Sequence, residues 1–376
     1  MLKIHFHTGA KTNSAKHCFG YGRVYHSLLR FVPRVAEVKF VENYKEADIQ
    51  VCMIMPEMSV KYYHWWGRKQ HPVQVFYTPW DAEKIPPSWF EVLFEHTNAK
   101  AIFTTSRWCV STFANAFRKY GKELPIYLAQ HGVNVEAFPY FERDWSGDLV
   151  YLWQGQNLMD RKRGALVREA FMDLQLQNAH LVEKWYPIDS APWGPYEYTE
   201  QKRLEVGQFL NGQSYHDLLK MSHVSVNPSR AEGFGLLPLE TACTGMATAA
   251  TNWSGFTDYL NDECFWPLAY ELSAEGEDYF NTSLFNSDLK VPPCQDALVS
   301  KEEVQRFMLW CYENREAAKE MGKRAHEYVK KNWTWDRSAL QFLDALHDVA
   351  EQHPMKKSWR TRLLDILYSL RDRHVS

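Results

Sequence analysis

Short runs of apolar residues recur along the chain, and stretches with helical spacing separate most of them. In the first half, these runs predict strands at residues 2–7, 37–41, 49–55, 73–78, 101–105 and 126–130. Helical periodicity follows Gly22 and returns around residues 109–117. Strands that alternate with helices predict a parallel sheet with helices on its faces.

The same pattern starts again in the second half of the chain. Apolar runs predict strands at residues 149–154, 180–184, 224–227 and 247–251. The stretch "FPYFERDWSGD" between the two series is polar and contains Pro and Gly, which favours a domain boundary there. We therefore predict an α/β protein with two doubly wound, Rossmann-like domains, at residues 1–142 and 143–335. Residues 336–376 are predicted to form C-terminal helices.

Two further segments stand apart from this pattern. Residues 186–200, "YPIDSAPWGPYEYTE", are rich in Pro and aromatic residues and predict a loop or hairpin. Residues 356–376 predict an amphipathic helix with apolar positions at i, i+3, i+4 and i+7. We interpret its basic face as solvated. The alternative is contact with an anionic surface, either a membrane or nucleic acid.

Composition narrows the class of protein. A chain of 376 residues exceeds the usual single domain, and 45% hydrophobic with 24% charged residues is typical of a soluble globular protein. A net charge of −3 argues against a general attraction to nucleic acid. Seven cysteines without a CxxC pair argue against a disulfide framework or a zinc site. With no signal peptide or spanning segment in the sequence, we expect a cytoplasmic protein.

The stretch "PSRAEGFGLLPLE" places two glutamates, Glu232 and Glu240, around a Gly-Phe-Gly turn and an apolar run. It follows a predicted buried strand and opens a predicted helix, whose N-terminal N–H groups favour a phosphate. Gly233 and Gly235 would let the backbone approach a ligand closely. A carboxylate on each side of a phosphate site suits the hydroxyls of a nucleotide-sugar. Equally open is a helix whose N-terminal glutamate only complements the dipole.

The segment "EGFGLLPLE" resembles the E-x7-E signature of retaining glycosyltransferases with the GT-B fold, in particular glycosyltransferase family 4. Other segments resemble that family in the expected order: "GYGRVYHSLL" (20–29), "TPWDAEKIPPSW" (78–89), "TTSRWCVSTF" (104–113), "AQHGVNVEAF" (129–138), "NWSGFTDYL" (252–260) and "WTWDRSALQFLDAL" (333–346). The resemblance implies two Rossmann-like domains facing each other across a cleft, with a C-terminal helix that crosses back to the N-terminal domain.

The resemblance also implies roles for individual residues. Glu240 would accept hydrogen bonds from the ribose of the donor, and Glu232 would lie against hydroxyls of the donor sugar. His131 would lie near that sugar, although a single histidine is more often structural. Donor-binding backbone is implied at Gly20, Gly22, Gly233, Phe234, Gly235, Leu236 and Leu237.

The departing nucleotide diphosphate develops negative charge that must be stabilised. No two aspartates in the sequence are separated by one residue, so the metal-binding Asp-x-Asp pair of many glycosyltransferases is missing, and cationic side chains are expected instead. The stretch "GQNLMDRKRG" carries Gln156 and Arg163 where the family has its two basic residues. We favour Arg163 first and Arg161 second, because a guanidinium matches phosphate oxygens. The alternative is a solvated charge run.

Asp81 and Trp80 follow a predicted strand and resemble an acceptor-side loop. Asp81 would hold or activate the acceptor hydroxyl, or would simply cap its turn. The resemblance implies a front-face, retaining transfer from a nucleotide-diphosphate sugar, with no cofactor and no metal ion. The acceptor is expected to be a saccharide or a lipid-linked saccharide. Hydroxymethylated pyrimidines in phage DNA, a GT-B epimerase activity and a non-catalytic nucleotide-sugar binder stay open as alternatives.

Overall fold

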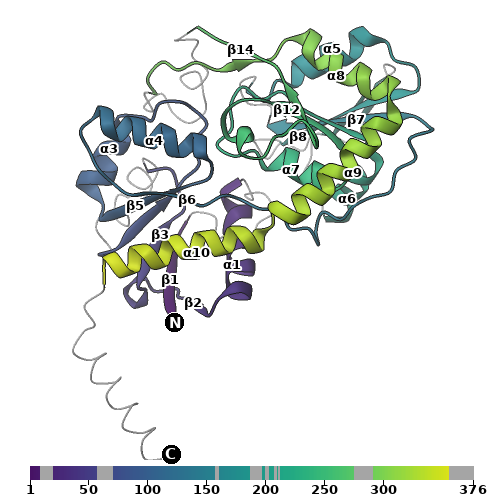
Figure 1. Ribbon diagram of the computed structural model, residues 1–376. Coiled ribbons are helices and arrows are strands. Elements are labelled where there is room, and N and C mark those ends of the chain that lie inside the picture. Colours follow the sequence, from purple (N-terminus) through teal and green to yellow (C-terminus); the bar gives the residue numbers. More distant parts are fainter. Residues whose placement is uncertain are drawn as a thin grey trace, which may run out of the picture.

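The computed structural model has two lobes, each a parallel sheet with helices on its faces (Figure 1). It describes residues 1–8, 20–56, 71–156, 161–186, 197–199, 203–206, 210, 212–274 and 291–354. The first lobe holds strands β1 to β6, and the second holds β7 to β13. This arrangement confirms the predicted α/β fold with two Rossmann-like units.

The sheet of the N-terminal lobe has six strands in the order β2-β1-β3-β4-β5-β6, all parallel. Their bounds are β1 Leu2–His7, β2 Val38–Phe40, β3 Ile49–Cys52, β4 Gln74–Tyr77, β5 Ala99–Thr104 and β6 Ile126–Leu128. Each of the six apolar runs of the first half therefore forms a strand. The central strands β3 and β4 are buried at every position, which explains why they lack a polar alternation.

Helices α1 (Gly20–Val35), α3 (Ser88–Glu91) and α4 (Arg107–Lys119) belong to this lobe, with short helical turns η3 (Tyr44–Glu46) and η4 (Val92–His96). Both predicted helices are present as α1 and α4. The hydroxyl of Ser106 caps α4 by accepting a hydrogen bond from the backbone N–H of Cys109.

The sheet of the C-terminal lobe has seven strands in the order β13-β12-β11-β7-β8-β10-β9. Their bounds are β7 Leu149–Gln156, β8 Ala179–Tyr186, β9 Glu197–Thr199, β10 Arg203–Val206, β11 Val224–Asn227, β12 Ala247–Thr251 and β13 Trp266–Leu268. All neighbours are parallel except β9 and β10. Strand order reverses between β7 and β11, and ligands of open α/β sheets bind at such a point.

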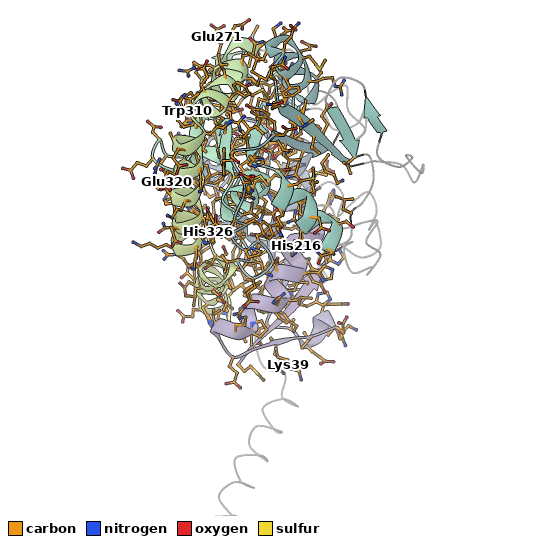
Figure 2. The ribbon with its side chains drawn as sticks, turned by 90° about the vertical axis from the view of Figure 1, so that its right-hand side faces the viewer. Lys39, His216, Glu271, Trp310, Glu320 and His326 are labelled. Carbon is orange, nitrogen blue, oxygen red and sulfur yellow. The ribbon has the colours of Figure 1, made fainter. Side chains whose placement is uncertain are left out.

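The helices of this lobe are α5 Gly164–Leu174, α6 Gly212–Met221, α7 Leu236–Cys243, η5 Ser254–Asp258, α8 Lys301–Glu313 and α9 Arg315–Asn332. Strands β14 (Glu271–Leu272) and β15 (Ala297–Leu298) form a separate antiparallel pair. Figure 2 shows the molecule from the side, with Lys39 on β2 in the N-terminal lobe and Trp310, Glu320 and His326 along α8 and α9.

The closing helix α10 (Trp335–Gln352) leaves the C-terminal lobe and runs under the N-terminal sheet (Figure 1). Its apolar face joins the core of that lobe, where it packs against α1 and the strands. The return of the C-terminal helix is confirmed. Most of the predicted loop at 186–200 and all of the predicted basic helix at 356–376 lie outside the described residues. Within the described part, no helix is long and apolar enough to cross a membrane.

Phe342 of α10 lies in the N-terminal core, where it is 1% exposed and contacts the rings of Phe6, Tyr77 and Phe103. We expect Phe342→Ala to lower the free energy of unfolding by about 3–5 kcal/mol, the usual cost of an aromatic-to-alanine change in a core. Urea denaturation measures the change. Leu340→Ala is the matched control on the same helix, because Leu340 is 48% exposed. Equal losses in the two variants would contradict the packing role of α10.

Candidate active site

Two loops meet where the strand order of the C-terminal sheet reverses. Arg161 and Lys162 follow β7, and Glu232 follows the neighbouring strand β11. Because parallel strands end at one edge of the sheet, these loops converge there. Nη1 of Arg161 donates to Oε1 of Glu232 at 2.7 Å, and Nζ of Lys162 donates to the same oxygen. The carboxylate of Glu232 therefore has two cations against it, from the turn before α5, some 70 residues earlier in the chain.

This cluster is buried, and burial sets its electrostatics. Glu232 is 7% exposed. Burial acts to raise the pKa of Glu232, but the charges and hydrogen bonds of Arg161 and Lys162 outweigh it and hold the pKa below its usual value. Burial lowers the pKa of Lys162, and Glu232 opposes that effect. Glu232 is thus a carboxylate at neutral pH, with positive charge concentrated around it.

The backbone fixes the position of this pair. The N–H of Glu232 donates to the hydroxyl of Ser254 at 2.9 Å, and its carbonyl accepts from the N–H of Gly255 at 2.8 Å. Arg161 is tied to the same loop, because its carbonyl accepts from the N–H of Arg230 at 2.9 Å and its Nη1 donates to the carbonyl of Ala231 at 3.0 Å. Such contacts preorganise the charged groups before any ligand binds.

The N-terminal lobe adds a second carboxylate to the cluster. Asp81 follows β4, and its Oδ2 lies 3.1 Å from Nη1 of Arg161. Its Oδ1 accepts the backbone N–H of Gly233 at 2.6 Å. Burial raises the pKa of Asp81, and Glu232 adds to the rise, against the opposing charges of Arg161 and Lys162. Asp81 therefore bonds across the two lobes instead of capping its own turn. The neighbouring Trp80 is 4% exposed and packs on Trp89 in the core.

The backbone of Gly233 makes hydrogen bonds to the N-terminal lobe. Its N–H donates a hydrogen bond to Oδ1 of Asp81. Its carbonyl accepts from Oγ1 of Thr105 at 3.0 Å and from Sγ of Cys109 at 3.3 Å. A Cβ added at Gly233 would lie 2.8 Å from Cβ of Pro79 and 2.9 Å from the backbone nitrogen of Trp80. The close approach that the sequence predicted for a ligand is made here by the other lobe.

We expect Gly233→Ala to hold the lobes apart, since the added methyl group would contact the backbone at Trp80. Overpacking of this kind costs about 1–3 kcal/mol, which predicts that the ratio of closed to open form falls about 10-fold or more. Small-angle X-ray scattering measures the opening as a larger radius of gyration. Gly147→Ala is the control, because its nearest neighbour would lie 3.8 Å away. An unchanged radius of gyration would contradict this interpretation.

The second glutamate lies inside helix α7. Gly235 precedes the helix with a left-handed φ of 85°, and a Cβ there would collide with the ring of Phe256. Glu240 is 3% exposed, and its Oε1 accepts from Nη2 of Arg23 on α1. Burial raises the pKa of Glu240, and Arg23 opposes the rise. Glu240 therefore also connects the two lobes, through a residue that the sequence did not single out.

The remaining predicted residues lie around these pairs. Gly20 and Gly22 form the start of α1, beside Arg23. His131 follows β6 and is 6% exposed. Burial and the charge of Arg23 lower its pKa to about 3, so it is neutral. Phe234 is buried, whereas Leu236 and Leu237 are half-buried in the first turn of α7.

Two of the predicted phosphate-binding residues flank the cluster. Gln156 is the last residue of β7. Arg163 precedes α5 with a left-handed φ of 55°. Arg161 and Lys162, instead of the favoured Arg163, make the contacts to Glu232. In the described ranges, no group of three or more His, Cys, Asp and Glu side chains gathers in a way that could hold a metal ion.

Comparison with known proteins agrees with this fold. Residues 199–342 match the family described as family 4 glycosyltransferase in conflict systems. No curated protein matches the chain. A glycosyltransferase from Rickettsia africae superposes with a TM-score of 0.63 at 12% identity, over 95% of this chain and 99% of that one.

Two further solved structures have similar scores. The protein Alr3699/HepE of Anabaena, in complex with UDP and glucose, gives a TM-score of 0.60 at 10% identity, over 93% of this chain and 100% of that one. The sucrose-phosphate synthase of Thermosynechococcus elongatus gives 0.59 at 12% identity, over 94% and 100%. Identities this low establish the shared fold, and the matched family covers the segment that carries Glu232 and Glu240.

Proposed function

We propose that this chain, a GT-B glycosyltransferase similar to family 4, transfers a sugar from a nucleotide-diphosphate sugar to a hydroxyl acceptor with retention of configuration and without a metal ion. The observation that carries the proposal is the contact of Arg161 and Lys162 with Glu232 at the switch point of the sheet. Two buried cations beside a carboxylate offer what a sugar diphosphate needs: positive charge for the phosphates and an acceptor for sugar hydroxyls.

The donor would exchange places with the internal ion pairs. Its diphosphate would engage Arg161 and Lys162, while hydroxyls of its sugar would donate to Glu232. The ribose hydroxyls would donate to Glu240 in α7. Because the cations are already fixed by the loop backbone, they would stabilise the charge that develops on the departing diphosphate without first being ordered.

The transfer itself would follow a front-face course. The acceptor oxygen attacks the anomeric carbon on the side from which the diphosphate leaves, and the bond between that carbon and the phosphate oxygen breaks. The acceptor proton passes to the departing diphosphate. Both glutamates are committed to donor hydroxyls, which leaves neither as a nucleophile for a double displacement. Asp81 reaches Arg161 from the N-terminal lobe, which supports a role in orienting the acceptor hydroxyl.

A UDP-sugar is the first donor to test, since Alr3699/HepE was solved with UDP-glucose. A thermal-shift screen of UDP-, GDP-, ADP- and dTDP-sugars would identify the base, because a ligand at 100 times its Kd adds about 2.7 kcal/mol of stability. Activity that persists in EDTA is the expected result for a cationic site. Activity that EDTA removes and added divalent metal restores would overturn the metal-independent part of the proposal.

For the acceptor we propose a saccharide or a lipid-linked saccharide, in keeping with the net charge of −3. A hydroxymethylated pyrimidine in DNA is the second candidate, favoured by the description of the matched family as acting in conflict systems. Transfer of labelled sugar to saccharide acceptors, to hydroxymethylated DNA and to plain DNA separates the two. Conversion of the donor without any acceptor would indicate an epimerase, and affinity without turnover would indicate a non-catalytic binder.

A further inference from the structure

Only one of the two carboxylate oxygens of Glu240 has a hydrogen-bond partner among the described residues. Its Oε1 accepts a hydrogen bond from Arg23, whereas its Oε2 is buried and has no hydrogen-bond partner among the described residues. A buried acceptor without a partner costs about 1–3 kcal/mol, so folded proteins rarely retain one unless something else completes it. The unpartnered oxygen of a residue that is 3% exposed therefore points to a ligand contact.

Arg23 reaches Glu240 from the opposite lobe. It lies in the first turn of α1, directly after Gly20 and Gly22, and Glu240 lies in α7, 217 residues further along the chain. Its side chain is 35% exposed, against 4% for that of Glu240. The pair thus forms only when the two lobes are together, as they are here.

We propose that Arg23 is a positioning residue for the donor: by holding Oε1 of Glu240 from the N-terminal lobe, it presents Oε2 to a ribose hydroxyl and makes nucleoside binding depend on contact between the lobes. This inference rests on the proposed ribose role of Glu240. It assigns to the first helix a function in recognition of the nucleoside, in addition to the close approach that its glycines allow.

The charge of Arg23 also acts on the pKa of Glu240. Burial raises the pKa of Glu240, and Arg23 is the cation that counters it. Around the pair, His131 is neutral at neutral pH because its pKa is lowered to about 3. On α7 itself, the thiol of Cys243 is uncharged because its pKa is raised to about 12, and Lys330 of α9 acts on that thiol. Without Arg23 the pKa of Glu240 would rise further.

The direction of the pH effect follows from this. The ionised carboxylate accepts a stronger, charge-assisted hydrogen bond from a ribose hydroxyl than the protonated acid does, so affinity for the nucleoside falls as the pH drops through the pKa of Glu240. Removal of Arg23 raises that pKa. The loss of affinity should then begin at a higher pH than in the wild-type protein.

The test is the Kd of UDP and of uridine, measured by calorimetry on the full chain between about pH 5 and 9. For Arg23→Gln we expect an affinity loss of about 10-fold or more for both ligands at neutral pH, with the midpoint of the pH dependence moved upward. Arg23→Lys should restore part of the affinity and of the midpoint. Arg30→Gln is the matched control, since Arg30 lies on the same helix but pairs with Glu136 at an exposed site, and it should bind like wild type.

The other outcomes separate failure of this inference from failure of the proposed function. If Arg23→Gln weakens UDP but leaves uridine unchanged, Arg23 serves the phosphates and the positioning role is wrong. If affinity falls without a shift in the pH midpoint and lysine restores nothing, the effect is a general loss of structure and again overturns it. If Glu240→Gln binds both ligands as tightly as wild type, the ribose role of Glu240 itself fails.

Discussion

Replacing Glu232 by glutamine is expected to lower kcat/KM for sugar transfer by a factor of about 100 to 1,000, while UDP still binds. The amide keeps the shape of the side chain but removes the charge that faces Arg161 and Lys162 at the switch point. It also replaces an oxygen that we propose accepts from the donor sugar by an NH2 group that cannot accept a hydrogen bond. Losses of this size are typical when one group that stabilises charge in the transition state is removed.

Stability must be followed in the same variant, because removal of one member of a buried ion cluster costs about 3–5 kcal/mol. The Tm of Glu232→Gln should fall, and UDP should raise it again, which would show that the site is still formed. Labelled-donor kinetics and calorimetry with UDP provide the two readouts. Glu136→Gln is the control, since its side chain is 58% exposed. Turnover within threefold of wild type in a folded Glu232→Gln protein would remove Glu232 from the reaction.

The apolar runs of the sequence located strands in both lobes, including the partly exposed β1, which matches its predicted run to the residue. Strands β11 and β12 match the predicted runs to the residue, and both are buried at every position. Strand β13 (Trp266–Leu268) was missed because it is short and contains a proline, a residue that disfavours a strand assignment. Strand β9 is the edge strand and β10 lies between it and β8; both carry polar residues, so no apolar run marks them. Edge strands depend on their neighbour more than on their own composition.

For the site, the spacing of Glu232 and Glu240 predicts a place for the donor, but it does not predict which side chains face the two carboxylates. Arg23 is 217 residues from Glu240, and no local pattern couples the two. The run Arg161, Lys162 and Arg163 could not be ordered from sequence, because the left-handed turn at Arg163 decides which side chains face the cluster.

The glycines show the same limit. Their presence at positions 233 and 235 predicted a close approach, and the structure has one at each. The approaching groups are a backbone segment of the other lobe at Gly233 and the ring of Phe256 at Gly235. A glycine permits a close approach, and only the tertiary structure shows which group makes it.

Arg161→Ala is expected to have the second large effect on transfer, a fall in kcat of about 100-fold or more. Arg161 is the residue that touches both carboxylates of the cluster, at 2.7 Å from Glu232 and 3.1 Å from Asp81. Its loss would remove a fork of donors suited to the departing diphosphate and leave Lys162 as the remaining cation on Glu232. Binding of uridine, which carries no phosphate, should change little.

The comparison with Arg163→Ala makes this prediction decisive. The sequence favoured Arg163, whereas the contacts in the cluster favour Arg161 and Lys162, so we expect Arg161→Ala and Lys162→Ala to lose far more kcat than Arg163→Ala. Single-turnover rates with saturating donor measure the chemical step and exclude effects on product release. If Arg163→Ala proves the most damaging of the three, Arg163 is the cation that serves the leaving group, and its side chain turns toward Glu232 only when the donor binds. The ion pair between Arg161 and Glu232 would then stabilise the site only in the absence of donor. Arg163 would be the cation that takes the place of a metal ion in the proposed transfer.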